Sequence, residues 1–299
     1  LQIEENNHIL NRELANVYAL YRANGIEPVL LKGQGVAQNY RIPLHRQCGD
    51  IDLYIGPKNY KTANKLLRQE ATGEHEDHKH TCIHWHGVDI ENHRVLSRFS
   101  SPSSDGHFQR EIARWHNTAA CRNLEIEGCR VTLPPLSFDV AYVLAHSTLH
   151  FLNEGIGLRQ VCDWANLLHA RREEIDRKKT AKLLRQWGLS KAARVFGVVA
   201  VHYLGLPAED LPIAYTEKDL KTGEWLFNDI WQGGNFGRYT TKIKQRPKGY
   251  WRGKWYTFTR ATRRCREFGS LASAEARWYP LMLAVHSAQV QWNKLWNRN

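Results

Sequence analysis

The chain has 299 residues and a formal net charge of +12 at pH 7, and 42% of its residues are hydrophobic. This length suggests two domains, and the apolar content, which includes 11 tryptophans, can fill real cores. We expect no signal peptide and no membrane-spanning helix, because no apolar run reaches about eighteen residues. The 6 cysteines are scattered without paired spacing, which argues against a disulfide framework and favours reduced thiols in a cytoplasmic protein.

The first part of the chain predicts a helix, a strand and a glycine turn. Residues 1–24 carry apolar side chains at helical spacing, and residues 28–31 are typical of a short buried strand. The turn Lys32-Gly33-Gln34-Gly35 follows, with a short helix expected over residues 36–40. Glycines let backbone N–H groups approach phosphate oxygens closely, and a helix N-terminus adds partial positive charge. The turn therefore predicts a place for phosphates.

The next strand carries two aspartates one residue apart, in the run Gly49-Asp50-Ile51-Asp52-Leu53-Tyr54-Ile55. Side chains alternate between the faces of a strand, so Ile51, Leu53 and Ile55 should face the core. Asp50 and Asp52 should share the other face, where two close carboxylates repel each other unless a cation lies between them. Mg2+ prefers oxygen ligands, so a metal pair is one solution. A half-exposed strand without a metal is the alternative.

Residues 78–93 follow a helix expected over residues 60–69 and predict a hairpin that turns at His86-Gly87. Cross-strand partners share a face. One face should be apolar and the other polar, with the pairs Trp85–Val88 and Ile83–Ile90 on the first and His84–Asp89, Cys82–Glu91 and His80–His93 on the second. Imidazole and thiolate are good zinc ligands, but the spacing matches no common zinc signature. The polar face therefore predicts a polar cleft or a solvated surface, with a zinc site as a further alternative.

The rest of the chain is expected to be mostly helical. Residues 97–106 are typical of a loop, residues 119–133 of a hairpin around Glu127-Gly128, and the helical pattern begins at residue 134. The fold class is therefore α+β, with a domain at 1–133 and a helical domain at 134–299. Helices at 137–152 and after residue 155 carry His146, Arg159 and Asp163, which are expected either to contact substrate or to form a buried salt bridge.

A basic, aromatic segment spans residues 238–266. It holds 11 Lys or Arg residues and no Asp or Glu, which accounts for most of the net charge of +12. Basic residues interleaved with aromatic ones suit RNA or another polyanion, where phosphates are neutralised and bases stack. They also suit an anionic membrane surface. The plain alternative is a solvated basic face.

One stretch of the sequence resembles a known family. It contains Leu30-Leu31-Lys32-Gly33, Tyr40, Pro43, Arg46 and Gly49-Asp50-Ile51-Asp52-Leu53. This pattern resembles the bacterial nucleotidyltransferases of the DNA polymerase beta-like superfamily over residues 20–95, with a fainter similarity at 138–170. The resemblance implies a small mixed-sheet nucleotidyltransferase domain followed by helices. It also implies a third acidic residue on a later strand, which matches Asp89. The family often has a histidine two residues after this acid, a position that holds Glu91 here, so Glu91 stays an alternative.

The resemblance implies an enzyme that uses two Mg2+ ions, or Mn2+, to transfer a nucleoside monophosphate from an NTP such as ATP to a hydroxyl acceptor. Asp50, Asp52 and Asp89 would be catalytic and would bind metal, with Glu91 as a further metal ligand. Lys32, Gly33, Gln34, Gly35 and Arg46 would bind the triphosphate, and His84, His146, Arg159 and Asp163 are expected near substrate. The acceptor stays open among an RNA end, a protein, a sugar and a small molecule. Alternatives are an inactive binding or regulatory module that acts through residues 238–266, and a zinc-dependent hydrolase.

Overall fold

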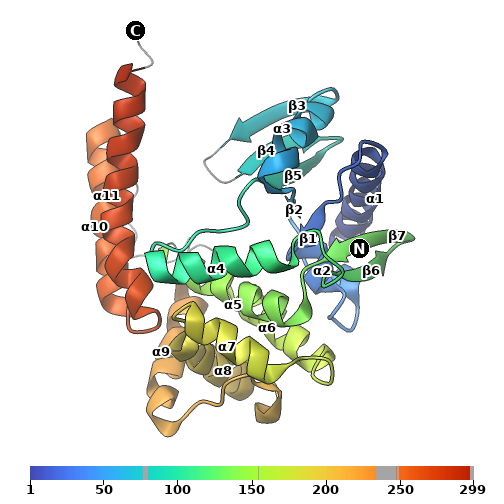
Figure 1. Cartoon of the computed structure of the whole chain (residues 1–299). Coiled ribbons are helices and arrows are strands. Elements are labelled where there is room, and N and C mark those ends of the chain that lie inside the picture. Colours follow the sequence, from blue (N-terminus) through green and yellow to red (C-terminus); the bar gives the residue numbers. More distant parts are fainter. Residues whose placement is uncertain (77–79, 154, 234–246, 248, 297–299) are drawn as a thin grey trace. The chain divides into compact units, whose positions relative to one another are not determined.

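The computed structural model describes residues 1–76, 80–153, 155–233, 247 and 249–296 (Figure 1). The chain forms two compact units, each built from several stretches. Residues 1–98, 111–140 and 166–175 belong to the first unit, and residues 99–110, 141–165 and 176–299 to the second. The predicted domains at 1–133 and 134–299 stay a prediction. Among the described residues, no helix combines the length and the apolar character that a membrane crossing needs.

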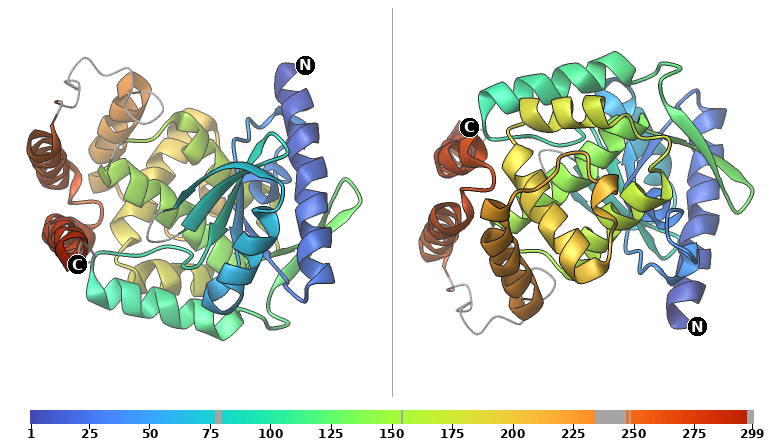
Figure 2. Two further views of the ribbon diagram at one scale, coloured as in Figure 1. Left: turned by 90° about the horizontal axis from the view of Figure 1, so that it is seen from above. Right: turned by 90° about the horizontal axis from the view of Figure 1, so that it is seen from below.

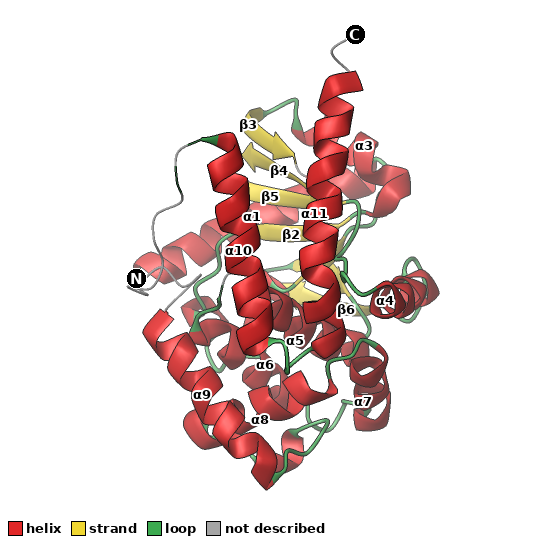
Figure 3. Ribbon diagram, turned by 90° about the vertical axis from the view of Figure 1, so that its left-hand side faces the viewer, coloured by secondary structure: helices red, strands yellow, loops and turns green. Residues whose placement is uncertain are grey.

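A mixed sheet of seven strands lies in the first unit, in the order β3-β4-β5-β2-β1-β7-β6 (Figure 3). The strands are β1 Val29–Leu31, β2 Ile51–Tyr54, β3 Ala71–Glu76, β4 His80–Trp85, β5 Val88–His93, β6 Arg122–Ile126 and β7 Cys129–Leu133. Strand β2 runs antiparallel to β1 and parallel to β5. The strand that carries the aspartates therefore lies between the strand that leads into the glycine turn and one strand of the hairpin.

Helices make up most of the remaining structure, so the predicted α+β class is confirmed. They are α1 Gln2–Ala23, α2 Gly33–Ala37, α3 Gly56–Leu67, α4 Pro102–Trp115, α5 Leu136–Asn153, α6 Leu158–Ala170, α7 Arg177–Gln186, α8 Ser190–Leu204, α9 Glu217–Gly233, α10 Tyr250–Phe268 and α11 Ser273–Trp296. The first predicted helix and the hairpin around Glu127-Gly128 are confirmed, the latter with positive φ at both turn residues.

Three predicted boundaries were wrong. Helix α2 begins at Gly33 instead of residue 36, and α3 spans Gly56–Leu67 instead of 60–69. The predicted loop at 97–106 contains the start of α4 at Pro102. There the Ser104 N–H donates to Ser101 Oγ at 3.5 Å, and proline has a backbone angle suited to the first helical position. The serines thus begin a helix, although their composition is typical of a loop.

Helix α1 packs along one face of the sheet (Figure 2). Its residues Leu14 and Val17 are fully buried, together with Ile51 and Leu53 of β2. Burial of each such side chain contributes about 1.5–3 kcal/mol relative to exposure. The predicted inward direction of Ile51, Leu53 and Ile55 is therefore confirmed, and the opposite face of β2 is left for polar side chains.

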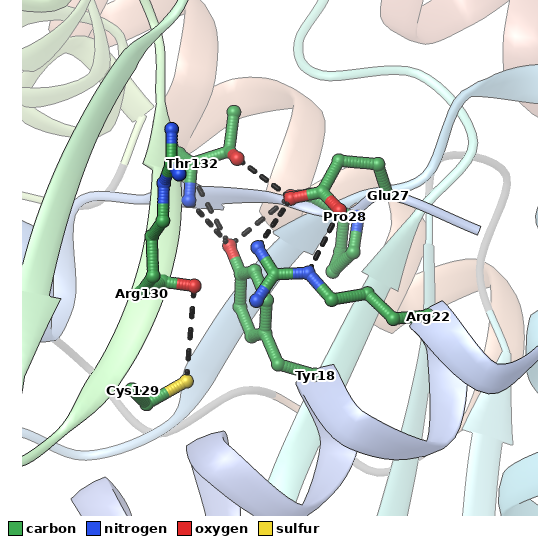
Figure 4. A network of polar contacts seen from close by, with 7 residues as sticks. All are labelled: Tyr18, Arg22, Glu27, Pro28, Cys129, Arg130 and Thr132. Atoms are coloured by element: carbon green, nitrogen blue, oxygen red, sulfur yellow. Dashed lines mark hydrogen bonds and ion pairs between the residues drawn. The ribbon is translucent and has the colours of Figure 1, made fainter. Parts of the chain in front are cut away.

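A buried tyrosine supports the short parallel contact between β1 and β7, which pair at Val29 and Thr132 (Figure 4). The Tyr18 hydroxyl contacts the carbonyl of Pro28 at 3.1 Å and accepts from the Thr132 N–H at 3.3 Å. Burial raises the pKa of Tyr18, so the hydroxyl stays protonated. Its contacts satisfy backbone groups at the edge of a short strand pair, where water is excluded.

Candidate active site

The β4–β5 hairpin has the predicted register at every pair. Trp85 lies opposite Val88, Ile83 opposite Ile90, His84 opposite Asp89, Cys82 opposite Glu91 and His80 opposite His93. The turn residues His86 and Gly87 have φ of 49° and 84°. Positive φ at both positions is the geometry of a two-residue turn that matches the strand twist. The hairpin therefore presents one polar row, as the alternation of its sequence predicted.

Three carboxylates meet where β2 runs beside β5. The register places Asp52 opposite Glu91. One ligand oxygen from each of Asp50, Asp52 and Glu91 lies within 4.8 Å of the others. Asp89 is not in this group: its carboxylate lies 2.9 Å from His84 Nδ1, and its side chain is 55% exposed. The geometry thus gives no support to the preference for Asp89 over Glu91 as the third acid.

Asp52 is the most buried of these acids, and the side chains of Lys32 and His93 contact one of its oxygens. Lys32 Nζ lies 3.0 Å from Asp52 Oδ1, and His93 Nε2 lies 2.9 Å from the same atom. Burial alone would raise the pKa of Asp52, but Lys32 and His93 outweigh burial and hold this pKa well below its usual range. Burial would likewise lower the pKa of His93, but its contacts with Asp52 and Glu91 raise it.

Asp50 is in a different electrostatic state. The charge of Asp52 and then burial raise the pKa of Asp50 to about 6, against the attraction of Lys32. Repulsion between two neighbouring carboxylates shifts their pKa values apart, as is seen at sites that concentrate negative charge. A divalent cation among the three carboxylates would relieve this repulsion, and oxygen-only ligands suit Mg2+. The donor set therefore fits the predicted metal.

The glycine turn has two parts with different roles. Lys32 and Gly33 have φ of 46° and 38°, so the chain enters α2 through the left-handed region. A side chain at Gly35 would come within 2.8 Å of Leu133, so this glycine permits close packing of α2 on the sheet. Gln34 is buried, and its amide donates to the Asp50 carbonyl at 3.4 Å.

The other predicted phosphate ligand, Arg46, is also buried. Its Nη1 contacts Cys48 Sγ at 3.2 Å, and its backbone carbonyl accepts from Asn7 Nδ2 at 2.8 Å. These contacts hold the segment before β2 against α1. Phosphate binding by Lys32, Gly33, Gln34, Gly35 and Arg46 stays a prediction.

A second group of ligand atoms lies beside the carboxylates. His80, Glu91 and His93 each offer one atom within 4.8 Å of the others, and Glu91 belongs to both groups. Cys82 lies opposite Glu91, but burial and the nearby acids raise the pKa of its thiol to about 12. Cys82 is therefore a neutral thiol when no metal ion is present, and its sulfur belongs to neither group of ligand atoms. Of the six residues predicted for the polar hairpin face, these three are the ones that converge.

The remaining predicted residues lie outside these two groups. His84 is paired with Asp89, and His146, Arg159 and Asp163 lie in the second unit, on α5 and α6. Their contact with substrate stays a prediction. Residues 238–246 and 248 of the basic segment lie outside the described residues. Helix α10 contains residues 250–266 of this segment, and its side chains Trp251 and Trp255 are 74% and 69% exposed.

One cation of the basic segment has an internal partner. The Arg264 guanidinium donates to the Phe151 carbonyl at 2.7 Å and lies 3.5 Å from Asp229. Burial lowers the pKa of Arg264. This arginine therefore helps to build the second unit, and the predicted polyanion surface must rely on other residues. Binding of RNA or another polyanion stays a prediction.

Sequence reasoning missed the contact between Lys32 and Asp52. Both residues were predicted to belong to the site, but with different partners. The antiparallel register pairs Leu31 with Asp52, which brings the residue after Leu31 next to this carboxylate. The alternation of side chains along one strand does not reveal which residue lies beside them on another strand.

Comparison with known proteins gives two matches. A family model described as "Uncharacterised nucleotidyltransferase" matches residues 1–205. The structure is similar to the crystal structure of an antigenic nucleotidyltransferase-like protein from Paracoccidioides brasiliensis, with a TM-score of 0.40 and 12% sequence identity. That match covers 73% of this chain and 96% of the other. No curated protein matches the sequence.

Proposed function

Because the chain belongs to the uncharacterised nucleotidyltransferase family, we propose that it transfers a nucleoside monophosphate from an NTP to a hydroxyl acceptor. The hydroxyl oxygen attacks the α-phosphorus, the bond to the bridging oxygen breaks, and pyrophosphate leaves. One observation carries this proposal: Asp50, Asp52 and Glu91 place three carboxylates within 4.8 Å of one another. This charge density suits a pair of divalent cations.

The metal-binding residues would be Asp50, Asp52 and Glu91. Mg2+ at this site would supply charge stabilisation for the attacking and leaving oxygens. The strands contribute positioning: Asp52 and Glu91 are fixed by the pairing of β2 with β5, so their oxygens are held in place before any ion arrives. We assign the third ligand to Glu91 in place of Asp89, because an oxygen of Glu91 lies within 4.8 Å of oxygens of Asp50 and Asp52, and Asp89 is outside this group.

Lys32 is the residue best placed to serve the triphosphate. It follows β1 directly, and its ammonium group lies among the acids at 3.0 Å from Asp52. With Asp52 bound to a divalent cation, this ammonium group would be available to contact a phosphate oxygen. Nucleotide binding and metal binding would then be coupled through one side chain.

The test is pyrophosphate release from each labelled NTP in the presence of separate RNA, protein, sugar and metabolite fractions. We expect label in one fraction, with release that depends on Mg2+. Release that persists in the double variant Asp50→Asn, Asp52→Asn would exclude this site. Nucleotide binding without a labelled product in any fraction would instead indicate an inactive binding module.

A matched pair of variants separates the two candidates for the third acid. Glu91→Gln removes a carboxylate from the group and should lower the transfer rate by a factor of about 10² or more. Asp89→Asn alters the neighbouring acid on the same strand and face and should retain most activity. The assignment of Glu91 fails if Asp89→Asn is the more damaging change. Circular dichroism of both variants controls for folding.

A further inference from the structure

We propose that His80, Glu91 and His93 form a zinc site beside the three carboxylates. Two imidazoles and one carboxylate are the ligands of many zinc enzymes, with the fourth position left to water or to a substrate oxygen. Mg2+ disfavours such a nitrogen-rich set. The site is therefore distinct in chemistry from the oxygen-only group of Asp50, Asp52 and Glu91, although Glu91 belongs to both.

The sheet brings these side chains together without help from a loop. His80 and His93 are direct cross-strand partners, and their ring centroids are 4.9 Å apart. Glu91 lies two residues before His93 on β5 and therefore projects from the same face. The His93 side chain is 8% exposed, and those of His80 and Glu91 are each 21% exposed. Two of the ligands thus remain accessible to an ion from solution.

Both imidazoles lie farther from Glu91 than a hydrogen bond requires, while His93 Nε2 also contacts Asp52 Oδ1 at 2.9 Å. His80 Nε2 lies 3.5 Å from Glu91 Oε1, and His93 Nε2 lies 3.4 Å from Glu91 Oε2. Hydrogen bonds between nitrogen and oxygen measure about 2.7–3.2 Å. Ligands bound tetrahedrally to zinc at about 2.1 Å lie roughly 3.4 Å from one another. Each oxygen of Glu91 thus lies near one imidazole, and one ligand atom from each of the three residues lies within 4.8 Å of the others.

The next pair along the hairpin shows the opposite arrangement. His84 Nδ1 lies 2.9 Å from Asp89, which is an ordinary hydrogen bond, and both side chains are about half exposed. The same residue types on the same strands therefore do not produce ion-like spacing by themselves.

Zinc binding would break the contact between His93 and Asp52, but Asp52 would still have a positively charged partner. Asp52 keeps its contact with Lys32 at 3.0 Å. The pair of sites would then share Glu91, with zinc on the histidine side and Mg2+ on the aspartate side. Zinc binding needs no nucleotide, so it can be tested apart from the proposed transfer reaction.

The test is a titration of the full chain, stripped of metal, with Zn2+ against a chromophoric chelator in excess Mg2+. We expect one Zn2+ per chain that Mg2+ does not displace. His80→Ala should weaken zinc binding by more than the 10–100-fold that is typical for loss of a supporting residue around a metal site. The matched control His84→Ala, on the same strand and face, should leave zinc affinity unchanged.

Three results would overturn the proposal: no stoichiometric zinc, displacement by Mg2+, or equal weakening by His80→Ala and His84→Ala. Co2+ substitution in the wild-type chain provides a second measurement that does not depend on a variant folding. A tetrahedral site with nitrogen ligands should give intense visible absorption, and an octahedral site should not. Asp50→Asn should abolish transfer but retain zinc, which separates failure of this site from failure of the proposed function.

Discussion

Replacement of Lys32 by methionine should destabilise the first unit by leaving a buried carboxylate short of positive charge. In the structure, Lys32 Nζ lies 3.0 Å from Asp52 Oδ1, and the two side chains are 18% and 4% exposed. Loss of one partner from a buried ion pair costs about 3–5 kcal/mol. His93 still contacts the same oxygen at 2.9 Å, and Lys32 is partly solvated. We therefore expect a loss of about 2–3 kcal/mol at neutral pH without divalent ions.

The expected loss has a specific electrostatic origin, which a double-mutant cycle can isolate. In an Asp52→Asn background the carboxylate is absent, so Lys32→Met should cost less than about 1 kcal/mol. Mg2+ should restore part of the stability of the single variant, because a cation bound to Asp52 replaces the missing ammonium group. Mg2+ should change the stability of the double variant very little.

The assay is urea denaturation monitored by hydrogen exchange of peptides from β2. This probe reports the unfolding of the unit that contains Asp52. Eleven tryptophans spread over the chain would mix the transitions of both units in fluorescence. Equal cost of Lys32→Met in the wild-type and Asp52→Asn backgrounds would refute the reasoning. In that case the lysine would stabilise the turn through its aliphatic packing and not through its charge.

Two further predictions concern neighbouring positions. The pKa of Asp50 is raised to about 6, above its unfolded value, so its contribution to stability is present at low pH and is lost as pH rises. Without divalent ions, the free energy of unfolding of the first unit, measured by urea denaturation, should therefore fall by up to ~3 kcal/mol between about pH 4 and pH 6, and Asp50→Asn should flatten this profile. Gly35→Ala should lower the free energy of unfolding by about 1–3 kcal/mol in thermal melts, because its Cβ would lie 2.8 Å from Leu133. The control variant Gly49→Ala, with open space around it, should be nearly neutral in the same measurement.

Local patterns predicted the hairpin correctly because its register depends on two adjacent turn residues. With His86 and Gly87 at positive φ, every pair from Trp85–Val88 to His80–His93 follows from counting outward. The inward direction of Ile51 and Leu53 followed in the same way from alternation along one strand. Helix boundaries were less accurate, since the serines before α4 fit a loop by composition and a helix start by hydrogen bonding.

The third acid could not be chosen from the sequence, because Asp89 and Glu91 project from the same face of β5. Two facts separate them, and both are long-range. The parallel register of β5 on β2 places Glu91 opposite Asp52, and His84 on the neighbouring strand engages Asp89. The first depends on the register of β5 against β2, whose paired residues lie 39 positions apart in sequence, and no turn between the two strands fixes that register.

The position of Lys32 shows the same limit and explains why its role was only half predicted. A lysine beside a glycine turn suggests phosphate binding, and nothing in its neighbourhood suggests a carboxylate partner. Yet the pairing of Leu31 with Asp52 makes that partner unavoidable, because it brings the residue that follows β1 beside the acidic strand. A single ammonium group therefore offsets the charge of the buried acid in the structure, and under the proposed function the same group would contact a phosphate oxygen. The turn that was predicted to bind phosphates thus also supplies positive charge beside this carboxylate.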